Sequence, residues 1–128
     1  MHAVFEHQVG LRWRDVDALG HVNHAVFLTY LEEGRDAFYV QALGRDPEYV
    51  VARVEIDLRA EVRYTDRQLQ VRIAVERVGT TSLTTRETIL TPTGVTVAEA
   101  RVVTVLWDTD ARKPKAFTAD ERARLAAY

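Results

Sequence analysis

The feature that most restricts the fold is an alternation of apolar and charged side chains over residues 50–64. The apolar positions are Val50, Ala52, Val54, Ile56, Leu58, Ala60, Val62 and Tyr64. Every odd position from Arg53 to Arg63 carries a charge. A period of two is typical of a strand with one face in the core and the other in water. We therefore expect one long β-strand over residues 50–64.

Three more strands are expected after this one, at about residues 68–78, 81–91 and 95–107. The segments between the strands are short and contain Thr, Gly, Pro and Asp. Links of this length join antiparallel neighbours, because a parallel crossover needs many more residues. Residues 4–14 predict a further strand near the start of the chain, which brings the expected sheet to five strands.

One long helix is expected over residues 24–43. Its apolar residues recur at helical spacing: Phe27, Tyr30, Leu31, Gly34, Phe38 and Ala42. Gly34 falls on this apolar stripe, where a missing side chain lets another backbone come close. Gly44 follows the last periodic residue and is a good helix stop. A short final helix is expected after Thr118, which forms a capping box with Glu121.

A single long helix can bury its apolar stripe only by packing across the apolar face of the sheet. The expected fold is therefore of the α+β class, a curved antiparallel five-stranded sheet wrapped around a long central helix. A length of 128 residues suits one domain, which we expect to span residues 1–128.

Composition narrows the classes of function. The net charge is only −2 and the basic residues are dispersed, so we expect neither a nucleic-acid partner nor a membrane partner. The chain has no cysteine, which excludes a thiolate nucleophile. It has no apolar run of about 20 residues, and its first residues do not resemble a signal peptide, so we expect a cytoplasmic protein. The phosphate-loop patterns and the GxSxG serine elbow are also absent from the sequence.

The segment DVDALGHVNH, residues 15–24, crowds titratable groups at the start of the long helix. In a structural interpretation, Asp17 and Asn23 are helix caps and the histidines are solvated. In a functional interpretation, the unpaired N–H groups of the helix start polarise a substrate carbonyl. Asp17 then attacks the carbonyl or activates a water, and Gly20 provides the bend. An ester or a thioester suits such a site.

A metal site is a competing interpretation, because His21 and His24 lie three residues apart with Asp15 and Asp17 nearby. The spacing fits no strong metal signature, so we expect no metal, and we expect Asp15 to be a solvated neighbour. Two tryptophans near strand ends, Trp13 and Trp107, are expected in the core. We expect structural roles for Glu33 and Arg35 on the helix.

The stretch RWRDVDALGHVNHAVFLTYLEEGRDAF, residues 12–38, resembles the signature of the 4-hydroxybenzoyl-CoA thioesterase family. These proteins are acyl-CoA thioesterases of the hotdog fold. The matching positions are Asp17, Gly20, Val22, His24, Phe27, Tyr30, Glu33 and Arg35. The tail WDTDARKPKAFTADERARL, residues 107–125, also resembles the family's closing segment, so the resemblance covers nearly the whole chain.

The resemblance implies an acyl-CoA thioesterase that uses no metal or redox cofactor. Asp17 matches the family's catalytic carboxylate, a nucleophile or general base, and the backbone N–H of His24 matches the group that binds the thioester carbonyl. The family's active sites lie at a dimer interface, so we expect a homodimer or a homotetramer. We expect the amide of Asn23 to share the carbonyl, and His21 or Asn23 to position water or substrate. We expect substrate contacts from Gly20, Val22, Phe27 and Tyr30.

Three alternatives stay open at this point. The HVNH segment is similar to the HVNN of acyl-carrier-protein thioesterases, in which His21 would match a catalytic histidine, although Leu19 departs from that pattern. The same fold also suits a non-catalytic acyl-CoA-binding domain. A dehydratase or hydratase of this fold is the third alternative, but the chain lacks a segment like H-x-x-G-x-P-x-x-P.

Overall fold

The computed structural model describes residues 2–46 and 48–128, so residues 1 and 47 of the expected domain lie outside the described residues. The elements in chain order are β1 (Phe5–Gly10), η1 (Trp13–Asp15), α1 (His24–Leu43), β2 (Tyr49–Leu58), η2 (Tyr64–Asp66), β3 (Gln68–Val78), β4 (Ser82–Leu90), β5 (Thr96–Asp108), β6 (Lys113–Pro114) and α2 (Ala119–Leu125). The predicted succession of strand, long helix, four strands and short helix is confirmed. The two 3-10 turns η1 and η2 were not predicted.

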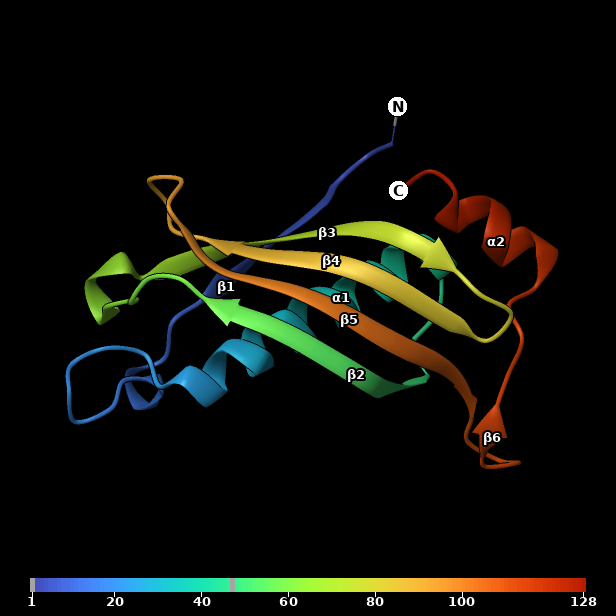
Figure 1. Ribbon diagram of the computed structural model, residues 1–128, viewed down its shortest axis with the longest axis horizontal. Helices are drawn as coiled ribbons and strands as arrows, with labels where there is room; N and C mark the ends of the chain where they lie inside the picture. Colours follow the sequence, from blue (N-terminus) through green and yellow to red (C-terminus); the bar gives the residue numbers. More distant parts are fainter. Residues whose placement is uncertain (1, 47) are drawn as a thin grey trace.

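The strands form one antiparallel sheet in the order β1-β3-β4-β5-β2, with the two residues of β6 paired to β5. The sheet curls around α1, which runs along its inner face (Figure 1). This is the expected hotdog fold. The loop over residues 15–23 and the turn η2 lie at one end of the sheet, and β6 and α2 lie toward the other.

The long helix begins and ends where the sequence predicts. Asn23 caps its start with a side-chain oxygen 3.0 Å from the N–H of Ala25, and Gly44 ends it in the left-handed conformation with φ 73°. At Gly34 the helix lies close against the sheet, because a Cβ placed there would lie 2.6 Å from Cγ1 of Val71 on β3. The close approach at Gly34 is confirmed, but the neighbour is the side chain of Val71 and not the expected backbone.

The predicted strand over residues 50–64 is too long. β2 ends at Leu58, and the chain then leaves the sheet, with Val62 buried and its carbonyl accepting the N–H of Val22 at 2.7 Å. The predicted burial of one face of β2 is confirmed only in part: Val54 and Ile56 are partly buried against the core, whereas Val50 and Leu58 are 39% and 48% exposed. The reason is topological: β2 pairs with β5 alone, at the edge of the sheet, while α1 packs mainly against β1 and β3.

Arg35 on α1 has the structural role that was expected, in an ion pair that was not predicted. It binds Glu87 on β4 through two contacts, Nε to Oε2 at 3.0 Å and Nη2 to Oε1 at 2.8 Å. Thr85 adds a hydrogen bond of 2.7 Å to Glu87 Oε2, and all three residues are buried. Bidentate geometry and the added hydroxyl satisfy charges that would otherwise be costly to bury.

Candidate active site

The loop between β1 and α1 closes on itself like a small hairpin. Val16 and Val22 form an antiparallel bridge, and Asp17 donates its N–H to the carbonyl of His21 at 2.9 Å. The tip is a turn in which Gly20 donates to the carbonyl of Asp17 at 3.1 Å. Gly20 has φ 82°, a conformation that glycine adopts without strain. Asp17 and His21 therefore face each other across the base of this turn, and Gly20 provides the expected bend.

The two oxygens of the Asp17 carboxylate have different surroundings. Oδ1 accepts the N–H of Leu19 at 2.9 Å, which fixes the side chain against its own turn. Oδ2 lies 3.7 Å from Nδ1 of His21. The side chains of Asp17 and His21 are 25% and 33% exposed, so both remain open to a ligand. The carboxylate is thus held by one oxygen, and its other oxygen points to the histidine.

At the helix entrance, only one of the two expected backbone donors is free. The N–H of Asn23 donates to the carbonyl of Asp15 at 3.0 Å, which contradicts the expectation that it holds a substrate carbonyl. The Asn23 side chain is also engaged, as the cap of Ala25. Within residues 2–46 and 48–128, no acceptor is bonded to the N–H of His24, the first residue of α1. His24 is exposed and begins the positive end of the helix dipole.

Asp15 is buried, so the expectation of a solvated neighbour is wrong. Its carboxylate is 2% exposed and accepts three kinds of donor: the N–H of Arg12 at 3.0 Å, Nε of Arg12 at 3.1 Å and Oη of Tyr30 at 2.7 Å. Burial by itself opposes ionisation, but these hydrogen bonds and the charge of Arg12 outweigh it and lower the pKa of Asp15. Burial and the same carboxylate raise the pKa of the Tyr30 hydroxyl.

The residues expected to contact substrate lie at different depths. Val22, Phe27 and Tyr30 are 3%, 4% and 0% exposed and form part of the core of the single chain. Gly20 is exposed at the tip of the loop. Contact between these residues and a substrate stays a prediction.

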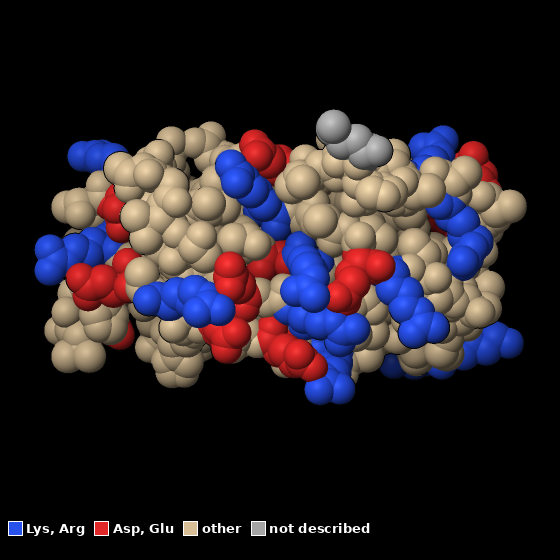
Figure 2. Space-filling model, turned by 45° about the horizontal axis from the view of Figure 1, so that its top comes forward, with Lys and Arg blue, Asp and Glu red and all other residues tan. Residues whose placement is uncertain are grey.

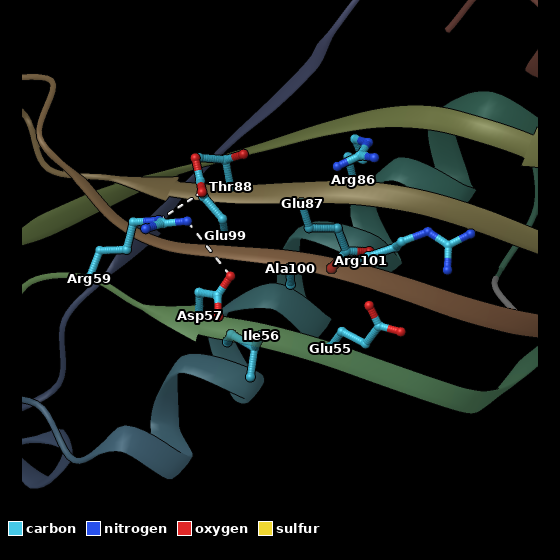
Figure 3. Close-up of a pocket in the computed structure, with 10 residues that line it drawn as sticks. All are labelled: Glu55, Ile56, Asp57, Arg59, Arg86, Glu87, Thr88, Glu99, Ala100 and Arg101. Carbon is cyan, nitrogen blue, oxygen red and sulfur yellow. Dashed lines mark hydrogen bonds and ion pairs between the residues drawn. The ribbon is translucent and has the colours of Figure 1, made fainter.

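One hollow lies on the outer face of the sheet, away from the predicted site. It measures about 710 Å³ and is lined by Glu55, Ile56, Asp57, Arg59, Arg86, Glu87, Thr88, Glu99, Ala100 and Arg101 (Figure 3). Its charges neutralise one another: Arg59 binds Glu99 at 2.7 Å, and Arg101 binds Glu76 at 2.6 Å. Figure 2 shows acidic and basic side chains intermingled across one face of the molecule. Paired charges of this kind form a hydrated surface and supply no free catalytic group.

No group of three or more His, Cys, Asp or Glu side chains is placed to hold a metal ion among the described residues. No helix over the same residues is both long and apolar enough to cross a bilayer.

Residues 11–125 match the sequence profile of a family described as the Thioesterase-like superfamily. The chain belongs to this superfamily. Its class of chemistry is thioester hydrolysis, and the resemblance noted in the sequence is confirmed at this level. A search among curated proteins finds no match.

Solved structures of other proteins share the fold over almost the whole chain. A predicted thioesterase from Bacillus stearothermophilus is 29% identical, with a TM-score of 0.85 over 97% of this chain and 95% of the other. A thioesterase from Thermus thermophilus, complexed with coenzyme A and Zn, is 28% identical, with a TM-score of 0.82 over 94% and 95%. The hypothetical protein SAV2348 from Staphylococcus aureus, in complex with CoA, shares the fold at 12% identity, with a TM-score of 0.85 over 100% and 85%.

Sequence reasoning missed two features beside the site of this superfamily member. Asp15 was not recognised as a buried residue, and Trp13, expected in the core, is 75% exposed. A signal for the turn was present, because the pattern Arg–aromatic–X–Asp occurs at residues 12–15 and again at residues 63–66, but it does not predict burial, since Asp66 is only partly buried. In both places it folds into a 3-10 turn with the aspartate oxygen bonded to the arginine N–H.

Proposed function

We propose that the protein hydrolyses acyl-CoA thioesters to a free acid and CoA, in a site formed by Asp17 and the start of α1. One observation carries the proposal: the loop that holds the Asp17 carboxylate leads directly to a helix start whose His24 N–H has no acceptor among the described residues. The relative from Thermus thermophilus, with coenzyme A bound, supports the choice of carrier.

The chemistry follows from the two groups. The N–H of His24, reinforced by the helix dipole, stabilises the developing negative charge on the thioester carbonyl oxygen. Oδ2 of Asp17 either attacks the carbonyl carbon, which expels the CoA thiolate and leaves a mixed anhydride, or removes a proton from a water that attacks instead. In the first route, water then hydrolyses the anhydride and restores the carboxylate. Both routes yield the acid and the thiol of CoA.

Replacing Asp17 tests the function. We expect Asp17→Asn to lower kcat for release of CoA thiol by at least about 100-fold, because it removes the group that attacks or activates water. Asp110→Asn is the matched control, since it makes the same change at an exposed turn near β6. Equal turnover by the wild type and Asp17→Asn across short, long, branched and aromatic acyl-CoAs would contradict the proposed role.

Label in the protein after a single turnover in ¹⁸O-labelled water identifies direct attack by Asp17. If Asp17 attacks directly and water then opens the anhydride at the Asp17 carbonyl, the ¹⁸O enters the protein and the product acid is unlabelled. If Asp17 is a general base, all the product acid carries ¹⁸O after one turnover and the protein carries none. Labelled protein after a single turnover therefore shows direct attack.

An acyl-carrier-protein substrate is the second candidate, favoured by the contact between His21 and Asp17 at 3.7 Å. On this alternative, His21→Asn lowers kcat, and acyl chains on the carrier protein are hydrolysed with a higher kcat/KM than the same chains on CoA. A non-catalytic acyl-CoA-binding role is distinguished by calorimetry, which would then detect tight binding without release of thiol.

We also propose a homodimer that joins sheet edges and helix entrances. The edge strand β2 has one neighbour, β5, and exposes Val50, Val51 and Leu58. An unpaired edge with apolar side chains is suited to pairing with a second copy around a two-fold axis. Val51→Asp is expected to shift the protein toward monomer in light scattering. A wild-type monomer at micromolar concentration would contradict both the dimer and a shared site.

A further inference from the structure

Two turns of this chain have the same sequence pattern and the same internal bonding. In η1 and η2, the arginine that precedes the turn donates its backbone N–H to Oδ2 of the aspartate at 3.0 Å. The backbone N–H of the aspartate donates to the arginine carbonyl at 2.9 Å. The second residue of the pattern is aromatic in both, Trp13 in the first and Tyr64 in the second. The shared closure places the aromatic side chain at equivalent positions of the two turns.

The two turns lie side by side. Leu11 donates its N–H to the carbonyl of Arg67 at 2.8 Å, and the rings of Trp13 and Tyr64 meet edge to face with centroids 5.3 Å apart. Yet Trp13 is 75% exposed and Tyr64 is 41% exposed. Exposed singly, such residues would need no explanation, but a preorganised pair of large aromatic rings at the surface is typical of a binding site.

Arginines flank the two aromatic residues in the sequence. Two come from each turn and its flanks: Arg12, Arg14, Arg63 and Arg67. Arg12 is bound to the buried Asp15, and Arg63 pairs with Glu61 at 3.3 Å. Arg14 and Arg67 are exposed and form no ion pair with a residue in the described ranges 2–46 and 48–128. The four arginines of residues 12–17 and 61–67 are matched in number by Asp15, Asp17, Glu61 and Asp66, so Arg14 and Arg67 offer cationic groups in a region of balanced charge.

The aromatic pair is also close to the proposed reaction centre. Trp13 precedes Asp17 by four residues, which limits the separation of their Cα atoms to about 14 Å. The loop over residues 15–23 and η2 lie at the same end of the sheet (Figure 1). An acyl-CoA has its thioester at one end of a long pantetheine arm and an adenine ring with phosphate groups at the other. Only the second end combines an aromatic base with negative charge.

We propose that Trp13 and Tyr64, together with Arg14 and Arg67, bind the adenine nucleotide end of CoA. The base stacks on the exposed aromatic surface, and the guanidinium groups contact the phosphates. The proposal rests on acyl-CoA as the substrate and adds a second binding region to the site at Asp17. It also gives a role to Trp13, which is exposed and does not pack in the core of the single chain.

Fluorescence tests the proposal without turnover. The chain has two tryptophans, so Trp107→Phe leaves Trp13 as the only one. We expect CoA to quench the emission of Trp13 in this variant saturably, 3′-dephospho-CoA to bind more weakly, and pantetheine to leave the emission unchanged. Tyr64→Ala and the double variant Arg14→Gln/Arg67→Gln are expected to raise the Kd for CoA about tenfold. Val40→Ala, at an exposed apolar position on α1, is the control.

Kinetics provide the second readout. Trp13→Ala is expected to raise KM for an acyl-CoA about tenfold with kcat unchanged, and to leave KM for the matching acyl-pantetheine unchanged. Quenching by CoA without hydrolysis of any acyl-CoA would support the nucleotide site while contradicting the proposed function. Hydrolysis of an acyl-CoA without quenching by CoA would support the proposed function and contradict the nucleotide site. The nucleotide site would be overturned if pantetheine quenched Trp13 as strongly as CoA does. It would also be overturned if iodide could not reach Trp13 before CoA is added, because a second copy of the chain covers it.

Discussion

The hydroxyl of Tyr30 donates a hydrogen bond of 2.7 Å to Oδ2 of Asp15, which ties the second turn of α1 to the chain that enters the site loop. The backbone carbonyl of Asp15 accepts the N–H of Asn23 at the far end of the same loop. Asp15 thus holds both ends of the segment that carries Asp17. The position of the proposed reagent relative to the N–H of His24 depends on a carboxylate that does not itself face solvent.

Removing the Tyr30 hydroxyl should therefore affect both stability and turnover. We expect Tyr30→Phe to lower the free energy of unfolding by about 1–3 kcal/mol, because it leaves the buried Asp15 carboxylate short of a donor. We also expect a lower kcat for thioester hydrolysis. Urea denaturation and the thiol-release assay measure the two effects.

Tyr39→Phe is the matched control for this substitution. It removes a buried hydrogen bond of 2.6 Å to Thr104, far along the helix from the site loop. We expect a comparable loss of stability from Tyr39→Phe and no change in kcat. If both variants lower kcat to the same extent, the effect of Tyr30 on turnover is a general consequence of reduced stability.

The pH dependence of stability reports on Asp15. Its hydrogen bonds lower the pKa of the carboxyl in the folded state below the value of about 3.9 in the unfolded chain. The ionised form therefore stabilises the folded protein fully above that value, and this contribution is lost as the pH falls through the folded-state pKa. Urea unfolding at pH 7, 5, 4 and 3 should show a shallower acid decline for Asp15→Asn than for the wild type. A constant difference between the two proteins at every pH would contradict this assignment.

The buried pair of Arg35 and Glu87 should show strong coupling. Removing one partner leaves the other charge buried without its counter-ion, so we expect Glu87→Leu and Arg35→Leu each to cost about 3–5 kcal/mol. The double variant Arg35→Leu/Glu87→Leu should cost much less than the sum of the two, because no unpaired charge remains. A double-mutant cycle by urea denaturation measures this coupling. Additive costs would show that the two charges act independently.

Periodicity predicted the elements well because it reports which residues share a face. It did not report what lies against that face, and β2 was misjudged for this reason: the alternation continues to residue 64, although the strand ends at Leu58 and lies at the sheet edge. Contacts between residues far apart in the sequence could not be predicted from periodicity either. Glu87 lies 52 residues from Arg35, and the burial of Asp15 depends on Tyr30, which is 15 residues away. Asp17, Gly20 and His24 could be proposed from the sequence because their spacing is local.

The contact between Gly34 and Val71 offers a test of how tightly α1 fits the sheet. A Cβ at residue 34 would lie 2.6 Å from Cγ1 of Val71, and a β-branched valine has little freedom to move aside. We expect Gly34→Ala to lower the free energy of unfolding by about 1–3 kcal/mol through overpacking, in spite of the better helix propensity of alanine. The double variant Gly34→Ala/Val71→Ala makes room for the new methyl group and should recover part of the loss relative to Val71→Ala alone. If Gly34→Ala is neutral or stabilising in thermal and urea unfolding, the helix does not need a glycine to approach β3 at this position.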